Sequence, residues 1–145
     1  TEKDVRDNYS VRICLESKSI RDAIGELSDE ALGKLTGRLR EILGEMDNCA
    51  RQGDLRNFTE RDADFHRAVI VATGNQVLLR LWEQCNMRNW FSVSALTDAE
   101  SLKQLQRGHQ RLVEEIAARD VRAAAATIEE HLTGLMDGFI RGVQP

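Results

Sequence analysis

Apolar residues recur along this chain of 145 residues in steps of three and four, which is the period of an α-helix and not of a β-strand. Six segments carry this pattern, at about residues 3–25, 28–51, 55–74, 76–94, 97–119 and 120–142. The single proline is Pro145, so the strongest helix breaker is missing from all of them. Long helical segments with short joints predict an all-α fold, an antiparallel bundle of six to seven helices.

Residue types that cap helices stand at the expected joints. Four segments are preceded by a side chain that accepts hydrogen bonds from first-turn N–H groups: Ser28, Asp54, Asn75 and Asp120. A capping box of the S/T-x-x-E type begins at Thr97, and Gly74 suits the end of the third segment. We expect the chain to form one helical domain over residues 1–145.

Three of the apolar stripes contain a residue of a type that can bind metals, an aspartate or a histidine. They are the stripe through Phe58, Asp62, Phe65, Val69 and Ala72, the stripe through Leu102, Leu105, His109, Leu112 and Ile116, and the stripe through Ala124, Ile128, His131, Leu135 and Phe139. His66 lies one helical turn after Asp62, so the two side chains are neighbours on one helix. All three histidines of the chain are therefore expected to face inward.

A buried carboxylate needs a positively charged partner, because an ionised group left alone in the core is strongly destabilising. A cation shared with imidazoles meets that need, and both groups are ordinary ligands for transition metals. This reasoning predicts one metal ion held by four residues: Asp62, His66, His109 and His131. The competing interpretation is a hydrogen-bonded pair of Asp62 and His66, with two unrelated histidines in the core.

The charge of the chain argues against direct binding to nucleic acid. Its 20 basic and 24 acidic residues give a net charge of −4, and the two signs are interspersed. A domain that neutralises DNA phosphates by itself usually carries a basic stripe. No run approaches the ~20 apolar residues that span a bilayer, so no membrane segment is expected and a cytoplasmic location is predicted.

Several stretches of the chain combine into a recognisable pattern. Asp62-Ala-Asp-Phe65-His66 is followed by Thr73-Gly74-Asn75-Gln-Val-Leu78, and Arg12-Ile-Cys-Leu15-Glu16 lies near the start. Asp120 lies 11 residues after His109 and 11 residues before His131, with Ala124 between them. Together these stretches resemble the FCD domain, the C-terminal effector-binding domain of FadR-type GntR transcription regulators. The resemblance covers about residues 11–131, and one departure is Arg119, where glycine is common.

The resemblance implies a fold, a site and a context. The helices would surround a central cavity for a metal and a ligand, with Asp62, His66, His109 and His131 as metal ligands. The metal would be one divalent transition metal ion, with Zn, Ni, Mn and Fe all left open, and the effector a small organic acid. The regulator would be a bacterial homodimer that contacts operator DNA only through a winged-helix domain, which is missing from this chain.

Two residues are expected to bind the effector. The guanidinium of Arg12 is suited to fork onto a carboxylate, although a helix-surface arginine paired with Glu16 at i,i+4 is an equal alternative. Asn86 falls on one stripe with Trp82 and is expected to line the ligand cavity. Its alternative is an asparagine that is simply hydrogen-bonded in the core.

The expected function is a sensor domain and not an enzyme. A helical metalloenzyme is one alternative, because a metal with open positions can activate water. It would need a general base outside the ligand set, and Asp64 lies about 100° or more around the helix from Asp62 and His66. A metal-free helical dimerisation domain is the other alternative.

The interspersed acidic charge predicts that this chain alone does not bind operator DNA specifically at physiological salt. An electrophoretic shift assay over a salt series checks this expectation. A specific, salt-sensitive shift with the isolated chain would contradict it.

Overall fold

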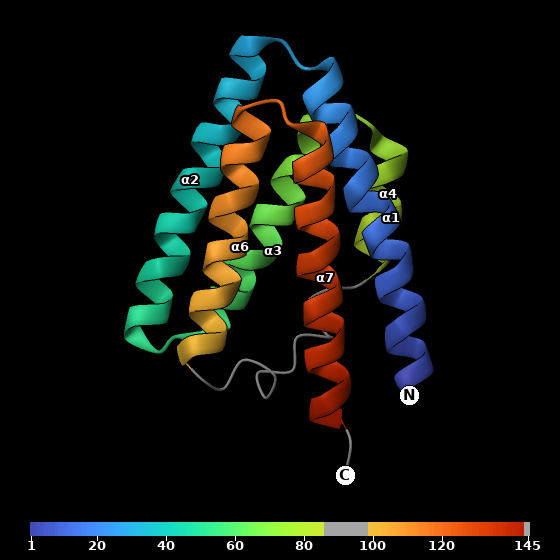
Figure 1. The fold of residues 1–145 in the computed structure, drawn as a ribbon, viewed down its shortest axis with the longest axis vertical. Helices are drawn as coiled ribbons and strands as arrows, with labels where there is room; N and C mark the ends of the chain where they lie inside the picture. Colours follow the sequence, from blue (N-terminus) through green and yellow to red (C-terminus); the bar gives the residue numbers. More distant parts are fainter. Residues whose placement is uncertain (86–98, 144–145) are drawn as a thin grey trace.

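The computed structural model describes residues 1–85 and 99–143, and within these ranges the chain forms six helices. They are α1 (Glu2–Glu26), α2 (Asp29–Gln52), α3 (Leu55–Ala72), α4 (Gln76–Gln84), α6 (Ala99–Ala117) and α7 (Val121–Val143). The predicted all-α fold is confirmed. Successive helices run in opposite directions, and both chain ends lie at the same end of the bundle (Figure 1).

The predicted caps explain where the helices begin. The side chains of Ser28, Asp54 and Asn75 accept hydrogen bonds from first-turn N–H groups of α2, α3 and α4. Asp120 does the same for α7, through the N–H of Ala123. Gly74 lies just after the C-terminal end of α3 and adopts the left-handed backbone conformation at φ 70°. The capping box predicted from Thr97 begins outside the described residues.

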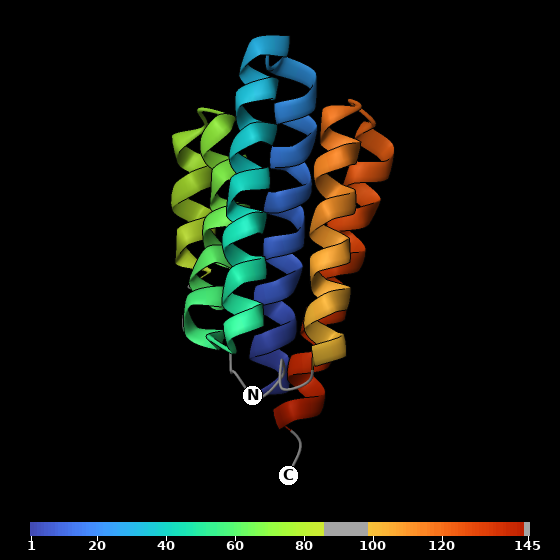
Figure 2. The same cartoon turned by 90° about the vertical axis from the view of Figure 1, so that its left-hand side faces the viewer.

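The helices form three layers. The pair α3 and α4 lies on one side of α1 and α2, and the pair α6 and α7 lies on the other (Figure 2). Helix α1 packs along α7 and contacts α3 and α4, whereas α2 packs on α3 and α6. Helices α1 and α2 diverge from their shared turn (Figure 1), so side chains of the two outer layers meet between them.

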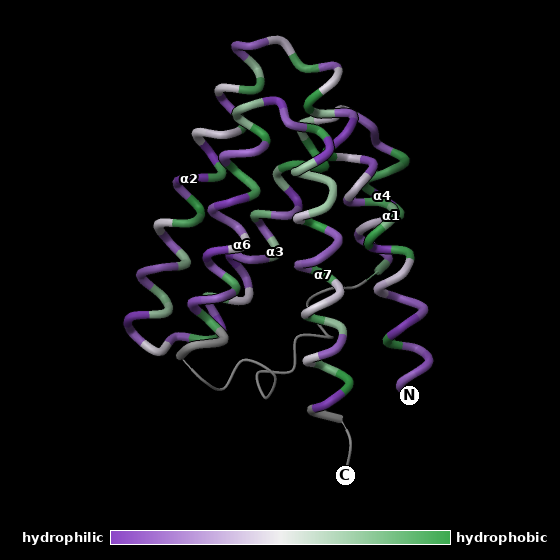
Figure 3. The backbone as a smooth tube through the Cα atoms, viewed as in Figure 1, coloured by the Kyte–Doolittle hydropathy of each residue, from purple (hydrophilic) through white to green (hydrophobic). Residues whose placement is uncertain are grey.

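A hydrophobic core extends through all three layers. Apolar and polar stretches alternate along each helix (Figure 3), as expected of helices that bury one face. The most buried large apolar residues include Leu39, Ile42, Met46, Phe58, Phe65, Ile116, Ile128 and Leu132. Among the described residues, five acidic or basic side chains are buried in this interior: Arg12, Glu16, Asp62, His66 and His109. No helix among the described residues is long and apolar enough to cross a membrane.

Arg119 joins the two turns at one end of the bundle. It adopts the left-handed backbone conformation at φ 55°, which costs a non-glycine residue about 1–2 kcal/mol. Its guanidinium donates to the carbonyls of Ile24 (2.5 Å) and Leu27 (2.9 Å) and to the carboxylate of Asp29 (2.7 Å). The departure from glycine at this position therefore adds a side-chain clamp between the α6–α7 turn and the end of α1.

We expect Arg119→Ala to destabilise the protein by about 1–3 kcal/mol, because it loses these hydrogen bonds and keeps the strained backbone. Arg119→Gly loses the same bonds but relieves the strain, so it should be more stable than Arg119→Ala by about 1 kcal/mol. Urea unfolding measures both differences, with Arg122→Ala, an exposed arginine of α7, as the control. Equal stability of the alanine and wild-type proteins would contradict the clamp.

Candidate metal centre

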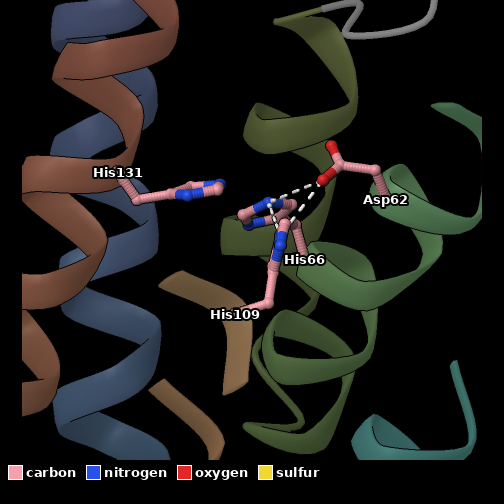
Figure 4. Close-up of side chains that lie close together, drawn as sticks. All are labelled: Asp62, His66, His109 and His131. Atoms are coloured by element: carbon pink, nitrogen blue, oxygen red, sulfur yellow. Dashed lines mark hydrogen bonds and ion pairs between the residues drawn. The ribbon is translucent and has the colours of Figure 1, made fainter. Parts of the chain in front are cut away.

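Four side chains from three helices converge in the bundle interior. Asp62 and His66 come from α3, His109 from α6 and His131 from α7 (Figure 4). Each offers one ligand atom, and these four atoms all lie within 4.8 Å of one another. The first three residues are at most 2% exposed, and the His131 side chain is half-buried. The structure thus brings together all four residues that the apolar stripes singled out.

Hydrogen bonds outside the cluster fix which nitrogen of His66 and His109 carries a proton. The Nδ1 of His66 lies 2.6 Å from a carboxylate oxygen of Glu16. The Nδ1 of His109 lies 3.0 Å from the carbonyl oxygen of Leu105, one turn earlier on α6. Both oxygens only accept hydrogen bonds, so each Nδ1 is the donor. In the neutral rings, both Nε2 atoms are therefore left with a lone pair.

These lone pairs point at the carboxylate of Asp62. Its Oδ1 lies 3.1 Å from the Nε2 of His109 and 3.8 Å from the Nε2 of His66, and the two nitrogens are 3.4 Å apart. Both Asp62 oxygens are buried, and neither receives a hydrogen bond in the described structure. Acceptors therefore face acceptors, which is unfavourable unless a cation lies among them. A proton would join only one pair, whereas a metal ion satisfies all of them.

His131 completes the cluster from the opposite layer. Its Nε2 is buried and has no hydrogen-bond partner among the described residues, and its ring centroid lies 4.4 Å from that of His109. Burial and the neighbouring imidazoles of His109 and His66 hold the pKa of His131 well below its usual value. The ring is thus kept in the neutral form that binds metals. Gly108 leaves room for it, because a Cβ there would lie 3.3 Å from the Nδ1 of His131.

Asp62 stays ionised despite its burial. Burial raises the pKa of its carboxyl, but His109, His66 and Arg12 lower it by more, so the net shift is downward. The donor set is one carboxylate and three imidazoles, which in its deprotonated form suits Zn, Ni, Mn or Fe. Two atoms that bind the same ion through bonds of about 2.1 Å can be at most about 4.2 Å apart, so a small contraction of this cluster would let it hold one ion.

A second charged group lies beside the cluster on α1. Arg12 is completely buried, and its Nε donates to Glu16 at 2.5 Å. The pair with Glu16 that belonged to the alternative interpretation is therefore present, but Arg12 is not at the helix surface. The Nη1 and Nη2 of Arg12 are buried and have no hydrogen-bond partner among the described residues, and its Cζ lies 5.6 Å from the centroid of the Tyr9 ring. The guanidinium thus keeps two donors for another acceptor.

Glu16 is not among the site residues predicted from the sequence, yet it lies beside the cluster. It is 2% exposed and accepts hydrogen bonds from Arg12, His66 and Trp82. Burial raises the pKa of its carboxyl, but Arg12 and His66 lower this pKa by more. The net result is a pKa well below the usual range of a glutamate. The same signal that marked Asp62, a charged side chain within an apolar helical stripe, could have found it.

Three further expectations concern Asn86, the Asp62–His66 pair and metal binding itself. Asn86, the second predicted effector residue, lies outside the described residues. The competing interpretation of an isolated Asp62–His66 pair does not describe the arrangement, because His109 lies closer to Asp62 than His66 does. That these four residues bind a metal remains a prediction.

Comparison with known proteins identifies the family. The FCD domain model matches residues 7–134. The chain is 24% identical over 135 residues to a Paenarthrobacter nicotinovorans protein named as a probable D-xylose utilization operon transcriptional repressor. It is 25% identical over 132 residues to YdhC of Bacillus subtilis strain 168, named as an uncharacterized HTH-type transcriptional regulator. These matches cover 93% and 90% of this chain, which spans only 58% of the length of each relative.

Solved structures share the fold. The metal-free FCD domain of the regulator TM0439 matches with a TM-score of 0.74 and 24% identity, over 99% of this chain and 96% of that one. The Zn²⁺-bound form of that domain matches with a TM-score of 0.69 and 25% identity, over 97% and 94%. Lar, which controls the agr system of Listeria monocytogenes, matches with a TM-score of 0.80 and 16% identity, over 93% and 62%. With a family model that matches residues 7–134, the chain belongs to the FCD domain family.

Proposed function

We propose that this chain is the effector-sensing domain of a bacterial transcription regulator, and that it senses a small carboxylate through a bound divalent metal ion. Asp62, His66, His109 and His131 would hold the ion. The observation that carries the proposal is that the Nε2 atoms of His66 and His109 face the buried Asp62 carboxylate, whose oxygens receive no hydrogen bond among the described residues. The donor set suits the ion, and a metal-bound form is known for the related domain of TM0439.

The charge balance of the site favours an anionic effector once a metal is present. With neutral imidazoles, Asp62 and Glu16 contribute two negative charges and Arg12 one positive charge. A divalent ion changes this local balance from −1 to +1, which a carboxylate neutralises. Arg12 supplies two Nη atoms that have no partner among the described residues, and a guanidinium matches the geometry of a carboxylate. When bound, the ion would supply a positively charged docking point for the carboxylate.

Control of transcription would require a DNA-binding part of the protein outside this chain. Both relatives are named as transcriptional regulators, and the chain spans 58% of their length. We propose that an attached winged-helix domain contacts operator DNA, and that effector binding changes its affinity by favouring one arrangement of the helices.

We expect the regulator to be a homodimer. Three of the four large apolar residues that are most exposed in the described structure, Val11, Val77 and Leu81, belong to α1 and α4, which pack against each other. Sedimentation equilibrium tests this expectation.

The enzyme alternative lacks support from the site. Asp64, the candidate base weighed on α3, forms an ion pair with Arg61 at 3.1 Å. The relatives are named as regulators, which favours a role in binding and not in turnover.

The first test measures metal content. Protein purified without a histidine tag should bind about one divalent transition metal ion per chain. His109→Ala should weaken metal binding by more than about 100-fold, because a direct ligand should contribute more than the 10- to 100-fold typical of outer partners. Elemental analysis and competition with a chromophoric chelator measure both quantities.

Asp64→Asn is the matched control, because it removes a carboxylate of the same helix that pairs with Arg61. Its metal affinity should stay within about twofold of wild type, since a half-exposed charge outside the ligand set is screened by water. Wild-type protein that neither carries metal nor binds added Zn²⁺, Ni²⁺ or Mn²⁺ would overturn the site.

The second test concerns the effector. A panel of small mono-, di- and tricarboxylic acids should include one that raises the melting temperature of the metal-loaded protein. The stabilisation should reach about 2.7 kcal/mol at a hundred times its Kd and should vanish after metal removal. Arg12→Ala, measured at saturating metal, should weaken binding by about 10- to 100-fold, because a charge-assisted hydrogen bond contributes about 1.5–3 kcal/mol.

Arg6→Ala is the control for this test. Arg6 also pairs with a glutamate four residues away on α1, but at the surface, so its loss should leave effector binding unchanged. Stabilisation that survives complete removal of the metal would overturn the mechanism, and conversion of the bound acid would favour the enzyme alternative.

A further inference from the structure

Glu16 accepts hydrogen bonds from three different helices. One of its oxygens accepts from the Nε of Arg12 on α1 at 2.5 Å and from the Nε1 of Trp82 on α4 at 2.9 Å. The other oxygen accepts from the Nδ1 of His66 on α3 at 2.6 Å. With its side chain only 3% exposed, Glu16 has little access to water, so these contacts define its environment.

Only an ionised carboxylate satisfies all three donors. It offers two oxygens with about four lone-pair positions and carries no hydrogen of its own. The Arg12 guanidinium is always protonated and the indole of Trp82 only donates, so neither can change its role. His66 can, because its proton can sit on either ring nitrogen. Glu16 therefore selects the form of His66 with the proton on Nδ1 and the lone pair on Nε2.

We propose that Glu16 is a positioning residue for the metal centre, which holds the His66 ring in the tautomer and orientation that direct its Nε2 lone pair toward Asp62 and His109. This inference rests on the proposed metal site. The short Nδ1 to Glu16 contact and the 3.4 Å separation between the Nε2 atoms of His66 and His109 are its geometric basis. A carboxylate that accepts a hydrogen bond from the other ring nitrogen of a metal-binding histidine also makes the imidazole a stronger ligand.

The same carboxylate sets the direction of Arg12. Because the Nε edge of the guanidinium is committed to Glu16, only its Nη1 and Nη2 atoms remain for an effector. Glu16 thus stands between the metal ligand His66 and the donor Arg12, and it orients both. The alternative is that Glu16 only neutralises Arg12 in the core. That role would affect stability, but it would leave the His66 tautomer and the metal affinity unchanged.

Glu16→Gln separates these two roles, because an amide has one acceptor oxygen and one NH₂ donor. If the amide oxygen keeps the bonds from Arg12 and Trp82, the NH₂ group faces the Nδ1 of His66 and donates to it. The His66 proton then moves to Nε2, where it blocks the metal position. The opposite orientation brings the NH₂ group against two donors, so the first orientation is expected.

The experiment measures the His66 tautomer and the Zn²⁺ affinity of the whole chain. Nitrogen-15 spectra of metal-free wild-type protein with labelled histidine should show His66 protonated on Nδ1, and Glu16→Gln should shift it to Nε2. Zn²⁺ affinity, measured by competition with a chromophoric chelator, should fall by about 10- to 100-fold in Glu16→Gln. Glu83→Gln is the matched control, because Glu83 also pairs with an arginine, Arg67, but lies at the surface of α4.

Each outcome decides the proposal. A wild-type His66 protonated on Nε2 would overturn it, and this measurement does not depend on whether Glu16→Gln folds. Folded Glu16→Gln protein with the wild-type tautomer and affinity would also overturn it, while leaving the proposed function intact. Wild-type protein that binds no Zn²⁺ would overturn the proposed function and the positioning role together.

Discussion

A buried carboxylate needs a positively charged partner, and the interior of this bundle contains two buried carboxylates, Glu16 and Asp62. Glu16 is neutralised by Arg12 within one helix and receives two further hydrogen bonds from α3 and α4. Asp62 has no comparable set of donors, and instead faces imidazole nitrogens whose protons are already committed elsewhere. Among the described residues, the first carboxylate has its donors and the second does not, so a cation is proposed at Asp62 and not at Glu16.

Much of the fold follows from local features of the sequence. The caps at Ser28, Asp54 and Asn75 begin helices because their side chains accept hydrogen bonds from free N–H groups, which depends only on residues nearby in the chain. The inward position of Asp62 and His109 follows in the same way from helical periodicity, since an apolar stripe fixes the buried face. These features were therefore predictable without knowledge of the packing.

The pairings within the site were not predictable, because they depend on how far each helix is displaced along its neighbour. Periodicity places Asp62 and His66 together on α3, yet the nearest imidazole to Asp62 belongs to His109 on α6. Glu16 was considered only as a helix partner of Arg12, because its contact with His66 spans 50 residues and is not visible in local spacing. Arg119 is a similar case, because its left-handed backbone is set by the turn it completes.

The distribution of the four ligand-type residues among the layers has a mechanical meaning. Asp62 and His66 belong to the α3–α4 layer, whereas His109 and His131 belong to the α6–α7 layer (Figures 2 and 4). An ion shared by them would act as a reversible cross-link between the outer layers of the bundle, closing chain loops between residues 62 and 131. Sliding of one outer layer against the other would then require stretching coordination bonds and not merely shifting apolar contacts. The stiffness of the bundle, and not only its local chemistry, would depend on occupancy of a single point at its centre.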